Sequence, residues 1–249
     1  MTFPRSPASF KYYDIVMVVF TAVLILSNIA SSAKIVDLGF SILGIRLAFD
    51  GGTLLFPLAY VLGDILTEVY GFKAARKAIY TGFVILAFSA LVFFVLGILP
   101  GEAHWEDQYG TAINGAGISG TAAYNAILGG ISSGGIVLAS LIAYLVGNFS
   151  NSMLISKIKV MMQGRLLWFR VILSSLVGEF LDSLIFVTIA CLTGVFGWDL
   201  FLSLVLTNYI LKCLIEALVL PLTYAVIRRL KKLEGIDTFD KDIKYKLFG

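Results

Sequence analysis

The chain has 249 residues, of which 59% are hydrophobic and only 14% are charged, with a formal net charge of +3. Soluble domains carry charged residues at about 25% of positions, so this composition excludes an ordinary soluble protein and requires lipid as part of the solvent. At this length we expect one membrane domain, without room for a second large module.

Several classes of function are disfavoured by the absence of their motifs. The sequence contains no Walker A pattern, no H-E-x-x-H helix and no C-x-x-C pair. Cys191 and Cys213 lie in apolar runs, and His104 is the single histidine. We therefore expect a protein that is not an enzyme and that uses no metal or other cofactor. The basic residues flank apolar segments, which indicates membrane topology and no binding to nucleic acid.

Six apolar segments are long enough to cross a bilayer, for which about 20 residues are needed. In chain order they are approximately 14–33, 51–70, 78–99, 130–150, 168–194 and 200–227. The sequence therefore predicts an all-α membrane protein, one transporter-sized domain over residues 1–249, with six transmembrane helices.

The loops between these segments alternate in charge. Lys and Arg fill both tails and the loops after the second and fourth segments, whereas the loop after the third is acidic, with Glu102, Glu106 and Asp107. Because basic loops stay on the cytoplasmic side, both termini are predicted to be cytoplasmic. For residues 108–130, which are rich in Gly and Asn, we expect an outer loop with a short helix; a re-entrant segment is the alternative.

Two short matches suggest an inverted repeat of three plus three helices, the topology that such repeats require. Residues 26–30 resemble 146–150, and residues 63–66 resemble 178–181. Apolar sequences also match by chance, so both interpretations stay open.

Charged side chains inside the apolar segments are the candidates for a binding site, because each costs about 2.5–3.5 kcal/mol on insertion scales. Two pairs share a helix face through their spacing, Asp64 with Glu68 and Glu179 with Asp182, and a third face carries Asn208, Lys212 and Glu216. These faces can meet only in the interior. A cavity with more carboxylates than lysines suits a ligand rich in N–H donors, a cation or a proton.

A structural role is the alternative for several of these residues. Lys212 would then neutralise Glu216 or Glu179, and Glu68 would pair with Lys73 or Arg76. The rings of Tyr60 and Phe186 lie near the charged positions and can either stack on a flat heterocycle or pack against other helices.

Specific residues resemble one family of transporters. Its signature D-x-x-x-E-x-Y-G-x-x-x-A-R is similar to residues 64–76, and its central block resembles Gly178-Glu179-x-x-Asp182-Ser183-x-x-Phe186. Residues 27–29 with Lys34-Ile35, Trp168-x-Arg170, and Tyr209-x-x-Lys212 with Glu216 also resemble its helices. The chain is identified as a member of the queuosine precursor transporters, which are grouped with vitamin uptake transporter-like proteins. The long Gly-rich stretch 110–135 departs from that pattern.

The resemblance implies an importer of 7-deazaguanine bases in the cytoplasmic (inner) membrane. The substrates would be 7-cyano-7-deazaguanine, 7-aminomethyl-7-deazaguanine or queuine, which serve tRNA modification. One carboxylate would accept from the guanine-like edge, and Lys212, Asn28 or Asn208 would donate to the carbonyl oxygen. The expected partners are this base, the lipid bilayer and a second copy in a homodimer. The substrate-binding subunit of an ATP-driven uptake system and a structural membrane protein remain alternatives.

Overall fold

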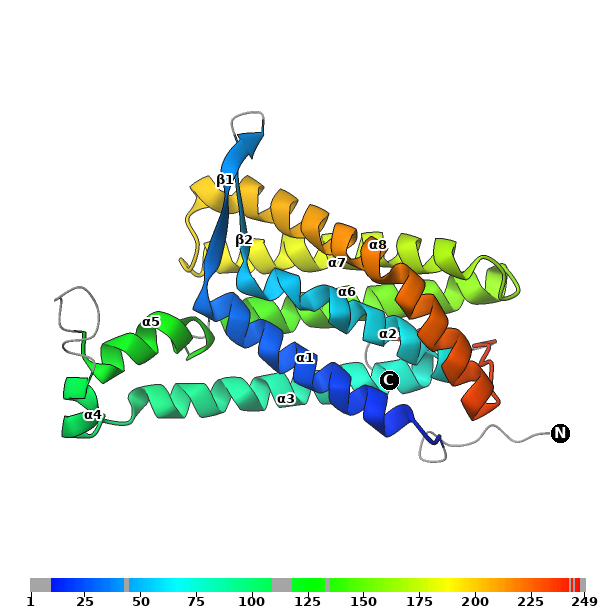
Figure 1. Cartoon of the computed structure of the whole chain (residues 1–249), viewed down its shortest axis with the longest axis horizontal. Helices are drawn as coiled ribbons and strands as arrows, with labels where there is room; N and C mark the ends of the chain where they lie inside the picture. Colours follow the sequence, from blue (N-terminus) through cyan, green and yellow to red (C-terminus); the bar gives the residue numbers. More distant parts are fainter. Residues whose placement is uncertain are drawn as a thin grey trace.

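The computed structural model describes residues 10–42, 45–108, 118–132, 135–241, 243, 245 and 246. The long helices lie roughly side by side along the long axis of the molecule (Figure 1). The elements in chain order are α1 (Tyr13–Ala33), β1 (Ile35–Ile42), β2 (Ile45–Asp50), η2 (Gly51–Leu54), α2 (Phe56–Tyr70), α3 (Phe72–Ile98), α4 (Ala103–Gln108), α5 (Gly120–Ser132), α6 (Gly135–Met161), α7 (Leu167–Leu192), η3 (Trp198–Leu200) and α8 (Phe201–Glu234).

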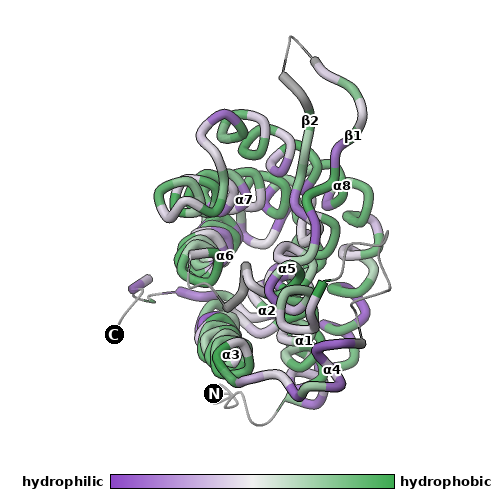
Figure 2. The backbone as a smooth tube through the Cα atoms, turned by 90° about the vertical axis from the view of Figure 1, so that its left-hand side faces the viewer, coloured by the Kyte–Doolittle hydropathy of each residue, from purple (hydrophilic) through white to green (hydrophobic). Residues whose placement is uncertain are grey.

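Five of the helices are long and apolar enough to cross a membrane: α1, α3, α6, α7 and, continuous with η3, α8. Their outward faces carry large apolar side chains that the protein leaves uncovered, such as Val18, Phe88 and Leu218. Apolar residues dominate these helices when the bundle is seen nearly end-on (Figure 2). Lipid must cover such surfaces, so the chain is a multi-pass membrane protein.

The second predicted segment forms a shorter helix than we expected. α2 has 15 residues, about 22 Å at the helical rise, which is less than the ~30 Å hydrocarbon core. Thirteen of its residues are buried, and α1, α3, α6 and α8 surround it. Because α2 is short and covered by protein, it does not by itself establish a sixth crossing. A crossing formed by η2 and α2 together remains a prediction.

A β-hairpin follows α1 and adds two strands to the otherwise helical fold that the sequence predicts. β1 and β2 pair antiparallel, with Ile35 opposite Asp50 and Val36 opposite Phe49. In the sequence, Lys34 and Arg46 made this segment look like a loop, and its apolar residues are too few for a span. The hairpin projects from the bundle (Figure 1), while β2 contacts α8 at its base and brings Asp50 into the interior.

The glycine-rich region contains the expected short helix, α5. It packs on α3 and α1, where Tyr124 Oη donates to the Phe93 carbonyl at 2.7 Å and Ser32 Oγ to the Ile127 carbonyl at 2.9 Å. Residues 109–117 of this region lie outside the described residues. The following long helix, α6, begins at Gly135, five residues later than the predicted segment at 130.

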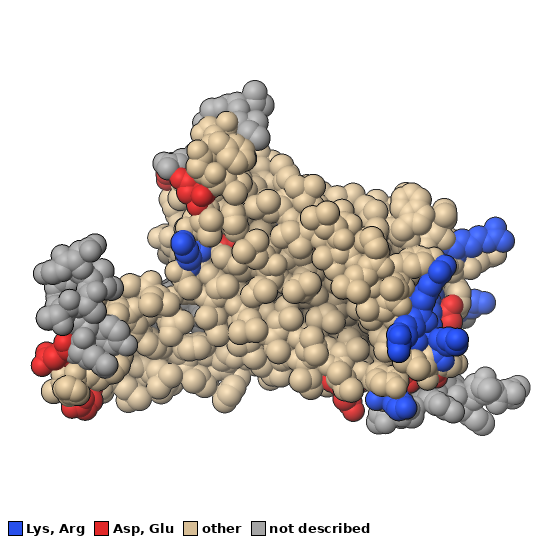
Figure 3. All heavy atoms as spheres, viewed as in Figure 1, with Lys and Arg blue, Asp and Glu red and all other residues tan. Residues whose placement is uncertain are grey.

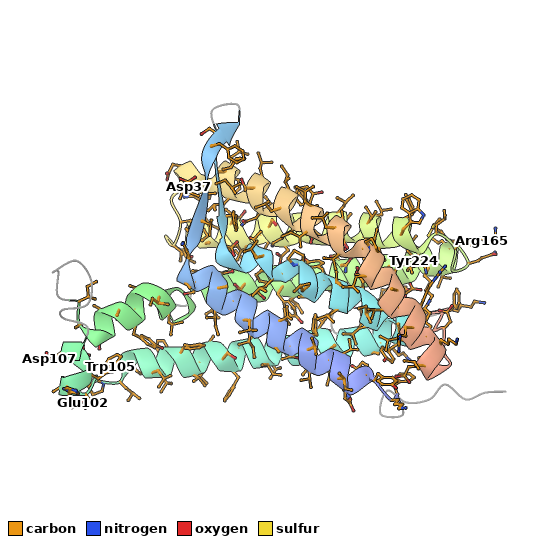
Figure 4. All side chains as sticks on the ribbon, in the orientation of Figure 1. Asp37, Glu102, Trp105, Asp107, Arg165 and Tyr224 are labelled. Atoms are coloured by element: carbon orange, nitrogen blue, oxygen red, sulfur yellow. The ribbon has the colours of Figure 1, made fainter. Side chains whose placement is uncertain are left out.

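The two ends of the bundle differ in charge. Lys and Arg gather where α1 begins and α8 ends, acidic residues gather at the opposite end beside α4, and the belt between them is nearly free of charge on the face shown (Figure 3). Figure 4 places Arg165 at the first end and Glu102 and Asp107 at the other. The positive-inside rule therefore favours a cytoplasmic basic end.

A topology reporter checks this orientation. A reporter joined after Lys232, near the end of α8, should be cytoplasmic, and one inserted beside Glu106 in α4 should be external. A cytoplasmic signal at Glu106 would contradict the orientation.

Candidate functional site

A column of buried polar side chains runs between α2, α6, α7 and α8. On α8, Asn208, Lys212 and Glu216 follow one another every four residues and are 1%, 2% and 5% exposed. On α2, Asp64 and Glu68 have the same spacing and are fully buried. Side chains four apart share a helix face, so each helix presents one polar face to the interior. Buried charges must be paired or bind a ligand, which makes this column the candidate site.

The layer nearest the hairpin is fully hydrogen-bonded. Asp50 Oδ1 accepts from Ser31 Oγ at 2.5 Å and from the Gly52 amide at 3.0 Å. The Thr53 hydroxyl lies 2.9 Å from Asp50 Oδ2 and 3.0 Å from Asn208 Oδ1. This layer joins α1, η2 and α8, and both oxygens of its carboxylate already have donors.

One turn further along α8, Lys212 forms a buried ion pair. Its Nζ lies 2.6 Å from Asp182 Oδ2 and 4.8 Å from the centroid of the Phe56 ring. The partner therefore differs from the predicted Glu216 or Glu179. The pair leaves Lys212 engaged, and it crosslinks α7 to α8.

The centre of the column holds three carboxyl groups in mutual reach, which we call the carboxyl trio: Asp64, Glu179 and Glu216. The Glu216 carboxyl lies close enough to each of the other two to interact with it electrostatically. Asn151 Nδ2 donates to Asp64 Oδ1 at 2.6 Å, and Ser175 Oγ donates to Glu216 Oε1. The remaining four oxygens, Asp64 Oδ2, Glu216 Oε2 and both of Glu179, find no hydrogen-bond partner among the described residues.

A small cavity reaches the trio between α7 and α8. Ser175, Glu179, Cys213 and Glu216 contribute to its lining, and its volume is about 30 Å³. A water molecule needs about 10–15 Å³ measured in this way, so the cavity admits water but no bicyclic base. A larger ligand reaches the trio only when the helices separate.

Two glycines fix the position of the acidic face of α7. A Cβ on Gly147 of α6 would lie 2.4 Å from Tyr60 Oη and 2.9 Å from Asp182 Cβ, and one on Gly178 would lie 2.9 Å from Asn151 Cβ. Tyr60 Oη also donates to the Gly178 carbonyl at 3.0 Å. Small residues let helix backbones approach closely, and here they hold Glu179 and Asp182 against α2 and α6.

At the basic end, an ionic network around Glu68 closes the column. Arg170 binds the Glu68 carboxylate with two nitrogens, at 2.7 and 3.0 Å, and Lys231 Nζ lies 2.6 Å from Oε1. Lys159 donates to the Glu68 carbonyl at 2.8 Å. We call these four residues, with Asp237, the basic-end lock. The partners of Glu68 thus come from α6, α7 and α8, and Lys73 and Arg76, which we predicted, take no part in these contacts.

Asp237, just after α8, completes the lock. Its Oδ1 lies 2.7 Å from both Lys159 Nζ and Lys231 Nζ. Burial alone would raise the pKa of this carboxyl, but hydrogen bonds from Lys159 and Lys231 outweigh it and hold the pKa below its usual range. Asp237 is therefore ionised at neutral pH and ties the segment after α8 to Lys159 of α6 and Lys231 of α8.

Two predicted site residues lie elsewhere. Asn28 lines a different cavity, of about 20 Å³, between α1, α3 and α6, and its amide donates to the Leu24 carbonyl at 3.0 Å. Phe186 belongs to an apolar cluster and packs on Phe196, with ring centroids 6.1 Å apart. Neither residue belongs to the polar column.

Other members of the column were missed in the sequence. Lys159, Arg170 and Lys231 looked like markers of topology because they lie near helix ends. Asn151 and Ser175 were missed because they are uncharged. Asn151 could have been found from the helical polar stripe on α6 that also includes Asn148, Ser152 and Ser156.

Comparison with known proteins decides the family. Residues 50–226 match the family model described as "Putative vitamin uptake transporter". The chain belongs to this family. The match extends from Asp50 into the second half of α8 and so contains the whole carboxyl trio. This transporter is also 29% identical, over 175 residues, to the "Probable queuosine precursor transporter" of Bacillus subtilis (strain 168), covering 70% of this chain and 69% of that protein. No solved structure gives a significant match.

The basic-end lock makes a prediction about stability. Arg170→Met removes the partner that binds both oxygens of the buried Glu68 carboxylate and leaves it with Lys159 and Lys231; breaking a buried ion pair typically costs about 3–5 kcal/mol. We expect the thermal unfolding midpoint of the purified transporter to fall by roughly 6–20 °C. Arg165→Gln, at an exposed position just before α7, is the control and should unfold like the wild type. Equal midpoints for all three proteins would show that the lock does not stabilise this state.

Proposed function

We propose that this transporter imports 7-deazaguanine bases into the cytoplasm, where they serve the modification of tRNA. The observation that carries the proposal is the set of four buried carboxyl oxygens of the trio that lack a donor. A site of this kind suits a ligand with several N–H groups. The likeness to a probable queuosine precursor transporter supports the 7-deazaguanines, among them 7-cyano-7-deazaguanine, 7-aminomethyl-7-deazaguanine and queuine, as that ligand.

The chemistry of the base complements the trio. A guanine-like edge presents an N1–H and an exocyclic amine side by side, and one carboxylate with two free oxygens can accept both. Glu179 has both oxygens free and is fully buried. Hydrogen bonds to a charged group contribute about 1.5–3 kcal/mol each, so Glu179 is the residue that we assign to this edge.

Neighbouring residues supply the remaining contacts. Lys212 is the buried donor next to the trio on α8, and it can turn from Asp182 to the carbonyl oxygen of the base. The Phe56 ring lies beside Lys212, and Tyr60 is hydrogen-bonded to the Gly178 carbonyl, next to Glu179 in the sequence. Stacking on such a ring is worth about 1–3 kcal/mol per base.

Import also requires movement, because the cavity at the trio has room for water only. The basic-end lock joins α2, α6, α7 and the end of α8 through Glu68. It blocks release toward the end that we assign to the cytoplasm. We therefore assign this structure to a closed state, from which the lock must part to release the base.

The test is restoration of queuosine in a host that can neither make nor import 7-deazaguanines. Expression of the wild-type chain, with 7-cyano-7-deazaguanine in the medium, should restore modified tRNA, measured by its mobility in a boronate gel. Arg228→Gln changes an exposed side chain at the basic end and should restore it equally. Glu179→Gln presents an amide N–H₂ to the donors of the base and should fail at low external concentration.

The membrane content of each variant serves as the control for expression. Unmodified tRNA despite wild-type protein in the membrane would reject the substrate assignment.

A further inference from the structure

We propose that the carboxyl trio also binds a proton that enters together with the base, so that import is driven by the proton gradient. The proposal rests on the proposed transport function and names the second species that the same site carries.

The starting point is the imbalance of charge in the trio. Three carboxyl groups share two neutral donors, Asn151 and Ser175, and four of their oxygens have no partner among the described residues. Like charges this close repel each other strongly in a protein interior, where the effective dielectric constant is far below that of water. A proton shared between neighbouring carboxyls replaces this repulsion with a hydrogen bond, as in other closely spaced carboxyl pairs.

The groups that face the trio are mostly neutral or acidic. Facing it are Tyr60 on α2, Asn148 and Asn151 on α6, Ser175 and Asp182 on α7, and Tyr209, Lys212 and Cys213 on α8. Lys212 is the cation among them, and Asp182 holds it at 2.6 Å. Within the described part of the chain, no three His, Cys, Asp or Glu side chains have the arrangement of a metal site.

The cavity at the trio also suits a proton. Its volume of about 30 Å³ accommodates water, which can carry a proton to Glu179 and Glu216. A proton can therefore reach the trio through a cavity that is too small for the base.

Coupling of the base to the proton follows from how many carboxyl groups of the trio each of them can neutralise. The donor edge of one base satisfies one carboxylate, Glu179, and leaves Asp64 and Glu216 in contact without a cation. A transporter loaded with base thus closes only when this pair holds a proton. In the empty transporter, Lys212 lies close enough to interact with Glu179 and can turn from Asp182 toward the trio. The loaded form then closes with a proton, and the empty form returns without one.

The experiment uses the purified full-length chain in proteoliposomes that contain a pH-sensitive dye. Labelled 7-cyano-7-deazaguanine is the probe, because its side group does not titrate. With an acidic exterior we expect accumulation above equilibrium, internal acidification on addition of the base, and loss of both effects with a protonophore. For one proton per base, each unit of pH gradient supports up to about tenfold accumulation.

Variants and a second assay separate coupling from transport. Residual uptake by Asp64→Asn and Glu216→Gln should not respond to the pH gradient, whereas Asp14→Asn, at an exposed position of α1, should respond like the wild type. Exchange of labelled for unlabelled base without any gradient reports transport alone. Exchange by the wild type without a response to the pH gradient, or accumulation driven by a sodium gradient, overturns proton coupling and leaves the transport function standing. Absence of exchange overturns both.

Discussion

A carboxylate inside a membrane protein needs a cation or several donors, and the arrangement of the helices here reflects how that need is met. Glu68 is met by Arg170, Lys159 and Lys231, Asp182 by Lys212, and Asp50 by hydroxyl and amide donors. The trio is the exception, because two neutral donors serve three carboxyl groups there. Since an unpaired buried charge costs several kcal/mol, that exception is where a ligand belongs.

The short central helix α2 connects the ligand site to the closure at the basic end. It carries Asp64 of the trio and, one turn later, Glu68 of the lock. Because a helix turn is rigid, a displacement of α2 that admits a base beside Asp64 also strains the contacts of Glu68 with α7 and α8. The protein surrounding α2 shields both carboxylates from lipid, which explains why this helix can be short and can carry them.

The sequence predicted which faces are polar, but only part of what those faces contact. Helical spacing places Asn208, Lys212 and Glu216 on one face, and the structure buries all three. Helical spacing does not say which helix lies opposite. Lys212 was therefore predicted to pair with Glu216 or Glu179, whereas its partner is Asp182. Charges near helix ends were interpreted through topology, which hid Arg170 and Lys231. The hairpin was missed because it is defined by the pairing of two strands. A search for long apolar runs does not detect such pairing.

The central claim is that Glu179 accepts the donor edge of the base, and equilibrium binding tests it most directly. Purified wild type and Glu179→Gln would each be titrated with 7-deazaguanine and with its analogue lacking the exocyclic amine. We predict that loss of the amine weakens binding to the wild type by roughly tenfold to a hundredfold, about 1–3 kcal/mol. The Glu179→Gln variant should bind the intact base more weakly than the wild type does, and loss of the amine should then have little further effect on its affinity. Equal affinity of both ligands for the wild type, with wild-type affinity in the variant, would contradict the account.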